Sequence, residues 1–96
     1  AGSWNLVVLI KPQFEAGKGQ VGKGGVVRDP RTHRTVLEIT LDFCMSNGWS
    51  IQGLMVSPIK GPAGNIEFLV SLAPGEAASA TVEALIASAL AEAQSL

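Results

Sequence analysis

Cysteine and charged residues are both scarce in this sequence. The single cysteine, Cys44, cannot form a disulfide framework or a metal site of spaced cysteines, so we expect no metal. Only 16% of the residues are charged and 47% are hydrophobic, and one explanation is that something else covers part of the surface. Yet no apolar run reaches the ~18 residues that a membrane-spanning helix needs. We therefore expect a soluble cytoplasmic protein.

Basic residues are absent after Lys60, although the net charge of the 96-residue chain is only −1. Six of the seven basic side chains lie between Lys11 and Arg34, and residues 61–96 carry four glutamates and no base. This asymmetry is compatible with a local anion site in the front half. The chain also begins almost directly on an apolar strand, which suggests a piece of a larger domain.

Hydrophobic patterning predicts one α/β domain in the order strand, helix, strand, strand, helix. Asp29 and Pro30 are typical of a helix start, because Asp accepts from free amides and Pro fits the first turn. Asn47 and Gly48 are typical of the end of that helix. The alanine-rich tail favours a second helix. The expected elements are, in order, residues 4–11, 30–47, 49–56, 65–72 and 76–95.

Lys11 follows five uninterrupted apolar residues and precedes Pro12. Such a run favours a central strand buried on both faces of a parallel sheet. Pro12 cannot donate to a strand ladder, so the strand ends there. Lys11 is then expected at the carboxyl end of the strand, where open α/β sheets bind ligands. Lysines also end strands for solubility alone, and position by itself leaves both interpretations open.

Glu67 is the one acid among the expected strand residues, and Lys11 is the one base. A helical crossover makes the first two strands parallel, and a direct loop makes the third antiparallel to the second. If the third strand lies beside the first, its start meets the end of the first, so Glu67 comes close to Lys11. Two opposite charges at one sheet rim form either a structural ion pair or an active-site pair, and both remain open here.

The loop expected over residues 12–29 carries five glycines. Its formal G-x-G-x-x-G pattern lacks the immediate helix of a dinucleotide site, and Gly24 stands where an NTPase phosphate loop needs Ser or Thr. Lys18, Lys23 and Arg28 are weaker candidates for contact with phosphates, against simple solvation of their charges.

His33 is the only histidine, and it falls in the first turn of the expected helix between Arg31 and Arg34. The pattern supplies neither a second histidine nor a carboxylate partner for it. We therefore predict an exposed histidine rather than a catalytic one.

Two long segments match the signatures of a known family. The first begins with Lys11-Pro-Gln-Phe-Glu-Ala-Gly-Lys and continues with Val-Gly-Lys-Gly-Gly-Val-Val-Arg-Asp-Pro30. The second is Ser57-Pro-Ile-Lys-Gly-Pro-Ala-Gly-Asn-Ile-Glu-Phe-Leu69. Both resemble the hemolysin A (TlyA) family of ribosomal RNA methyltransferases, which is related to FtsJ. The likeness covers about residues 5–72 and follows the family's order and spacing.

The resemblance implies a Rossmann-like domain that uses S-adenosylmethionine and methylates ribose 2′-hydroxyls of rRNA. Such enzymes carry a Lys-Asp-Lys-Glu tetrad, in which Lys11 matches the second lysine and Glu67 the glutamate. A lysine at this rim can hydrogen-bond the hydroxyl and act as its base, with Glu67 orienting it. The first lysine, the aspartate, the glycine-rich cofactor motif and the RNA-binding domain precede these segments in the family, and this sequence holds none of them.

Residues 1–96 are thus expected to form a single partial domain, the carboxyl-terminal portion of the methyltransferase, inactive alone and with RNA as the partner. Lys18, Lys23 and Arg28 would contact RNA phosphates. An open sheet edge and apolar face would favour self-association. Two alternatives remain: a membrane-active cytolysin, and a non-catalytic oligomerisation or RNA-binding module.

Overall fold

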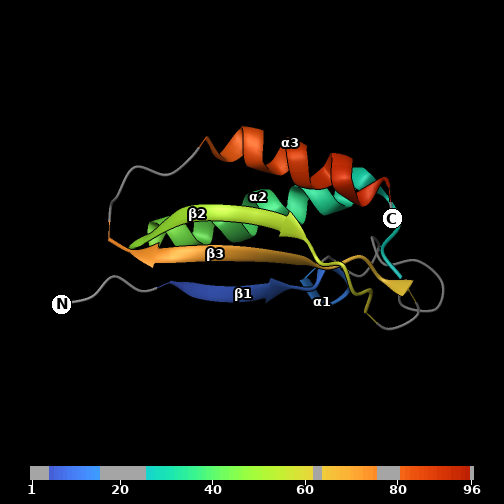
Figure 1. Cartoon of the computed structure of the whole chain (residues 1–96), viewed down its shortest axis with the longest axis horizontal. Helices are drawn as coiled ribbons and strands as arrows, with labels where there is room; N and C mark the ends of the chain where they lie inside the picture. The colour runs from blue at the N-terminus through green and yellow to red at the C-terminus, as the bar shows by residue number, and fades with distance from the viewer. Residues whose placement is uncertain (1–4, 16–25, 62–63, 76–80, 96) are drawn as a thin grey trace.

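A three-stranded sheet forms the centre of the computed structural model, which describes residues 5–15, 26–61, 64–75 and 81–95. The strands are β1 (Leu6–Ile10), β2 (Trp49–Val56) and β3 (Phe68–Pro74). The helices are α1 (Pro12–Glu15), α2 (Pro30–Ser46) and α3 (Val82–Ala93). Strand β3 lies between β1 and β2 and is antiparallel to both (Figure 1). The predicted order of strand, helix, strand, antiparallel strand and helix is confirmed, and β1 and β2 run parallel without touching.

Helix α2 begins and ends where its local chemistry predicts. The Asp29 carboxylate accepts a hydrogen bond from the backbone N of Arg31, and Pro30 occupies the first turn. At the other end, the Asn47 side chain donates to the Phe43 carbonyl, and Gly48 takes a φ of 88° that a side chain would disfavour.

Several bounds differ from the predicted ones, and two of the differences affect the segments around Lys11 and Glu67. The residues after Lys11, predicted as loop, form the short helix α1, because Pro12 has the φ of a helix start and the Phe14 N–H donates to the Lys11 carbonyl at 3.0 Å. Strand β3 begins at Phe68 rather than residue 65. Its expected first residues bond the preceding loop instead, since Ser57 N donates to the Glu67 carbonyl at 2.7 Å.

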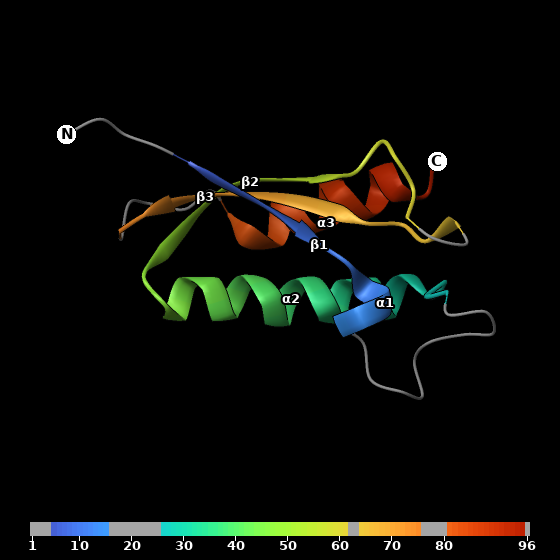
Figure 2. The ribbon, with the colours of Figure 1, turned by 90° about the horizontal axis from the view of Figure 1, so that it is seen from below.

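The hydrophobic core lies between one face of the sheet and helices α2 and α3. Phe68, Val70 and Leu72 alternate along β3 and point into it, as a strand's period of two requires. The helices contribute the buried side chains Val36, Leu37, Leu41, Ile86, Ala89 and Ala93. Figure 2 shows α2 lying as a layer beside the sheet. Because both helices pack on this face, the other face of the sheet is left open in the described part of the chain.

Strand β1 does not match the prediction of a central strand buried on both faces. Within the described residues it is an edge strand, paired only with β3. Val7 is 61% exposed and Leu9 is 42% exposed, and of this strand only Ile10 is fully buried. The prediction was wrong because an apolar run reports what a strand can bury, whereas burial depends on which other elements pack against it.

Candidate functional site

Lys11 and Glu67 lie at the same end of the sheet. Ile10 and Phe68 are register partners in the β1–β3 ladder, so Lys11 and Glu67 occupy the next pair of positions beyond it. The predicted geometry, an antiparallel third strand beside the first, is therefore confirmed. Helix α1 and the loop after β2 border this rim.

Glu67 is only 5% exposed, and two neighbouring segments hold its carboxylate in place. The side chain of Gln13 on α1 donates from Nε2 to Glu67 Oε2 at 2.8 Å. From the other loop, Gly61 lies so close that an added Cβ would be 2.6 Å from Glu67 Cδ. Gly61 N also donates to the Asn65 carbonyl at 2.8 Å, which links Gly61 to the segment that leads into β3.

The ammonium of Lys11 is not paired with this carboxylate. In the described part of the chain, the ion pairs are Asp29–Arg31, Arg34–Glu38 and Arg34–Glu83. Lys11 Nζ instead lies 5.8 Å from the ring centroid of Phe14, which is 74% exposed. A cation over an exposed ring gains about 0.5–1 kcal/mol. The structural ion pair, one of the two interpretations of these charges, is thus not formed here.

Gln13 has a second polar atom with no partner among the described residues. Its Oε1 is buried and accepts no hydrogen bond. Leaving a buried acceptor unpaired costs about 1–3 kcal/mol, more than the exposed contact of Lys11 with Phe14 gains. Sequence reasoning did not identify Gln13 as part of the site. Its position two residues after Lys11, on the turn into α1, was the available signal.

The backbone of Val27 connects the segment before β3 with the start of α2 through two hydrogen bonds. Its N–H donates to Asn65 Oδ1 at 3.0 Å, and its carbonyl lies 3.0 Å from His33 Nε2. Asn65 is 2% exposed, so this link between the loop before β3 and the segment before α2 is internal. Arg28 follows directly and is thereby presented at the surface.

His33 is buried rather than exposed, which corrects the prediction. It is 3% exposed, and its ring meets the Phe68 ring edge-on at a centroid distance of 5.8 Å. Desolvation lowers the pKa of this imidazole below its ordinary 6.5, against a smaller raising effect of the Val27 carbonyl. His33 lies three and four residues before the buried Val36 and Leu37, so helical spacing could have indicated the burial.

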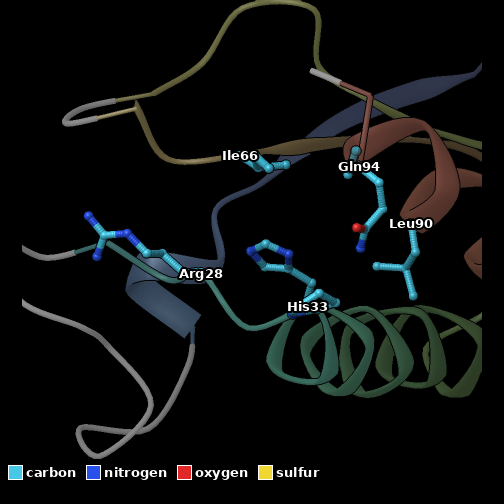
Figure 3. A pocket seen from close by; sticks show the side chains of 7 residues that line it. Arg28, His33, Ile66, Leu90 and Gln94 are labelled. Atoms are coloured by element: carbon cyan, nitrogen blue, oxygen red, sulfur yellow. The ribbon is translucent and has the colours of Figure 1, made fainter.

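Arg28 is the one of the three predicted phosphate-contacting residues that the structure describes, since Lys18 and Lys23 lie outside the described residues. It borders a cavity of about 110 Å³ between the start of α2 and the end of α3. Figure 3 shows the Arg28 side chain pointing away from the His33 ring, whereas Leu90 of α3 and Gln94, which follows that helix, lie on the far side. Arg28 is exposed, as a side chain that meets a partner must be. Neither Lys11 nor Glu67 lines this cavity.

The turn from β1 into α1 holds Lys11 and Pro12, so it lacks the glycine cradle of amides that nucleotide-binding turns present. The described residues contain no group of three or more His, Cys, Asp or Glu side chains that could hold a metal ion. None of the described helices is long and apolar enough to cross a membrane.

Known proteins match both the sequence and the fold. TlyA of Mycobacterium tuberculosis, a 16S/23S rRNA (cytidine-2′-O)-methyltransferase, is 48% identical over 69 residues, which are 71% of this chain and 25% of that protein. Hemolysin A of Brachyspira hyodysenteriae is 44% identical over 63 residues, 66% of this chain and 26% of that one. The solved structure of a candidate hemolysin from Streptococcus thermophilus superposes with a TM-score of 0.87 at 40% identity, covering 99% of this chain and 34% of that chain.

The chain thus spans about a quarter of the length of the curated relatives it matches. The FtsJ-like methyltransferase family matches residues 3–73 of this chain. That range includes Lys11, Glu67 and all three strands as far as Ala73. With that match over most of its length and the same fold in a solved relative, this chain belongs to the FtsJ-like methyltransferase family.

Proposed function

We propose that this chain is the carboxyl-terminal portion of an S-adenosylmethionine-dependent rRNA 2′-O-methyltransferase, and that Lys11 and Glu67 act on the ribose hydroxyl. The observation that carries the proposal is the placement of these two side chains at adjacent positions of one sheet rim. The names of the relatives support rRNA as the substrate and a cytidine ribose as the first target to assay. Since ribosomes lie in the cytoplasm, this function places the enzyme there.

Methylation of a ribose hydroxyl forms a bond between its oxygen and the methyl carbon in exchange for the bond from that carbon to sulfur, and the hydroxyl proton must leave. S-adenosylmethionine, when bound, supplies an electron-poor methyl group on sulfur. Lys11 at the rim is placed to hydrogen-bond the hydroxyl and, as the neutral amine, to take up its proton. The buried Glu67 carboxylate is placed to orient Lys11 once the lysine leaves the Phe14 ring, and to balance the resulting charge. The other tetrad members and the cofactor site belong to the remainder of the enzyme.

We assign RNA as the partner because the segment before α2 carries the basic residues Lys18, Lys23 and Arg28. Arg28 is exposed, and the Val27 backbone, bonded to Asn65 and His33, fixes the segment that carries it. A guanidinium is a good bidentate ligand for phosphate. We extend the same role to Lys18 and Lys23, whose positions within the loop remain a prediction from sequence.

The test is a chimera in which residues 3–73 replace the matching segment of the mycobacterial TlyA. We expect the chimera to transfer methyl groups to rRNA and the 96-residue chain alone to be inactive. Lys11→Met and Glu67→Gln should each reduce kcat by about 100-fold or more, as expected for general acid–base groups. Glu38→Gln on the exposed surface of α2 is the matched control and should keep full activity.

An active Lys11→Met chimera would contradict the catalytic roles and favour the non-catalytic module. Methylation by the 96-residue chain unaided would refute the partial-domain proposal. Leakage of liposomes caused by the pure chain would revive the cytolysin alternative.

Self-association is the second role that an observation favours. Val7, Leu9 and Met55 are exposed by 61%, 42% and 48% on the open face of the sheet, and β1 has an unpaired edge among the described residues. Apolar faces and free edges of this kind promote pairing with another chain. Sedimentation of the isolated chain should show a dimer or larger species, and Val7→Lys should shift it to the monomer; a monomeric wild type would contradict the idea.

A further inference from the structure

Gln13 connects the two charged groups of the rim. It follows Lys11 by two residues on the turn into α1, and its Nε2 donates to the buried carboxylate of Glu67 at 2.8 Å. Its other end, Oε1, is buried and has no donor within the described residues. The Gln13 side chain thus donates to Glu67 through Nε2, and its Oε1 could still accept a hydrogen bond from Lys11.

Lys11 is the nearest cation in sequence, and it has donors to offer. Its ammonium carries three N–H groups and now rests over the exposed Phe14 ring. That contact is weak compared with two costs within the described residues. One is the buried Gln13 Oε1 without a donor, and the other is the buried Glu67 carboxylate with only the neutral Gln13 amide as its donor. Both costs fall if the ammonium turns inward toward the rim.

We propose that Gln13 is a positioning residue that fixes the Lys11–Glu67 pair through both ends of its amide. Nε2 holds Glu67 Oε2, and Oε1 accepts a hydrogen bond from the Lys11 ammonium when the lysine leaves the Phe14 ring. The inference rests on the proposed function, in which these two groups act on the ribose hydroxyl.

A neutral amide suits this role better than a charged side chain. A carboxylate at position 13 would repel Glu67, and a lysine or arginine there would compete with Lys11 for it. Gly61 lies against the same carboxylate, with Oε2 the atom nearest to it, so Glu67 has little room to move without displacing the loop. The amide therefore sets the direction of Glu67 and, through Oε1, the resting place of the lysine head group.

The first test uses the TlyA chimera and separates kcat from KM. Gln13→Met keeps the length of the side chain and removes both hydrogen bonds. We expect kcat to fall by about 10–100-fold, the loss typical of misplaced reacting groups, with KM for RNA changed by less than about 2-fold. Gln13→Glu should lose at least as much. Gln52→Met, at an exposed glutamine of β2, is the matched control and should be unchanged.

The outcomes distinguish this inference from the proposed function. If Lys11→Met and Glu67→Gln inactivate the chimera while Gln13→Met keeps full kcat, the function stands and the positioning role is wrong. If Lys11→Met stays active, the proposed function itself fails. A loss at Gln13→Met that appears only in KM would also overturn the role.

A second measurement needs no activity. In NMR spectra of the 96-residue chain, the Gln13 side-chain amide should exchange slowly with water. Its resonances should shift in Glu67→Gln and in Lys11→Met, and stay in place in Glu38→Gln. A Gln13 amide that is insensitive to Lys11→Met would contradict the contact with Lys11, whatever the chimera does.

Discussion

Gly61 lies directly against the carboxylate of Glu67, with no room for a side chain between them. The contact joins the loop after β2 to the residue that precedes β3. It means that the orientation of the only buried carboxylate among the described residues depends on a residue that carries no functional group itself.

Replacing Gly61 with alanine should therefore displace Glu67. The added methyl overlaps a carboxylate whose Oε2 is also bonded by Gln13, so we expect a loss of about 1–3 kcal/mol in the free energy of unfolding, as for overpacking. In the chimera, kcat should fall by about 10-fold or more because the rim is distorted. Gly53→Ala is the control, since a Cβ there meets nothing within 4 Å. Equal behaviour of the two variants in urea unfolding and in methyl transfer would contradict the constraint.

Acid should destabilise the chain through His33. Burial lowers the pKa of the folded imidazole below its ordinary 6.5, so just below that pH the unfolded state binds more protons than the folded state. Stability rises with pH wherever this holds, and it should therefore fall as the pH drops from about 7.5 to 5.5.

His33→Gln isolates this effect, because its amide can still donate to the Val27 carbonyl but does not titrate. Urea unfolding at both pH values should show a smaller loss in the variant than in the wild type. The nearby Asp29 titrates outside this window, because its hydrogen bonds with Arg31 lower its pKa from 3.8. Parallel losses in the two proteins would rule His33 out as the cause.

Asn65→Ala should loosen the segment that carries Arg28. The variant leaves the buried N–H of Val27 without its acceptor, at a cost of about 1–3 kcal/mol in the free energy of unfolding. Asn47→Ala, at an exposed helix end, is the comparison and should cost less. Urea unfolding checks both, and hydrogen exchange should find the Val27 amide faster in Asn65→Ala alone.

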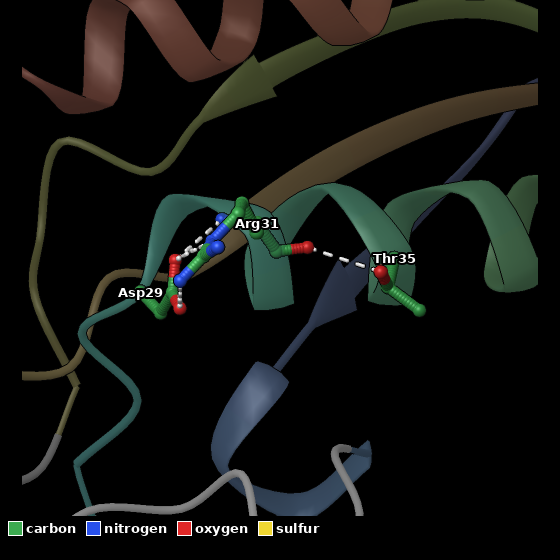
Figure 4. A network of polar contacts seen from close by, with 3 residues as sticks. All are labelled: Asp29, Arg31 and Thr35. Carbon is green, nitrogen blue, oxygen red and sulfur yellow. Dashed lines mark hydrogen bonds and ion pairs between the residues drawn. The ribbon is translucent and has the colours of Figure 1, made fainter.

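Asp29→Ala should weaken α2 and lower the midpoint of thermal unfolding, because it removes the carboxylate that caps the Arg31 N–H. Figure 4 shows that the same carboxylate also meets the Arg31 guanidinium, at 3.0 Å from Nη2, and that Thr35 donates to the Arg31 carbonyl one turn on. The guanidinium is exposed and its ion pair is screened by solvent, so Arg31→Ala should change the free energy of unfolding less than Asp29→Ala does. If thermal unfolding ranks the two variants the other way, the ion pair and not the cap holds this helix end.

Local chemistry in the sequence was enough to determine several elements. Strand β2 has the predicted bounds, Trp49–Val56, because turn residues mark both of its ends. The start of α2 follows from Asp29 and Pro30, whose effects act within one turn. The family signatures were readable for the same reason: they are contiguous runs that need no knowledge of what packs on them.

Only the tertiary structure decided the remainder, since it depends on residues distant in sequence. The exposure of β1 follows from both helices packing on one face of the sheet. His33 is buried because Phe68 and Val27 come to it from elsewhere. Strand order placed Lys11 beside Glu67, but the sequence could not show that Gln13 and Gly61, rather than the lysine, hold the carboxylate. Periodicity in the sequence indicates which face of a helix or strand a residue occupies. The packing of elements distant in sequence decides which residues it contacts there.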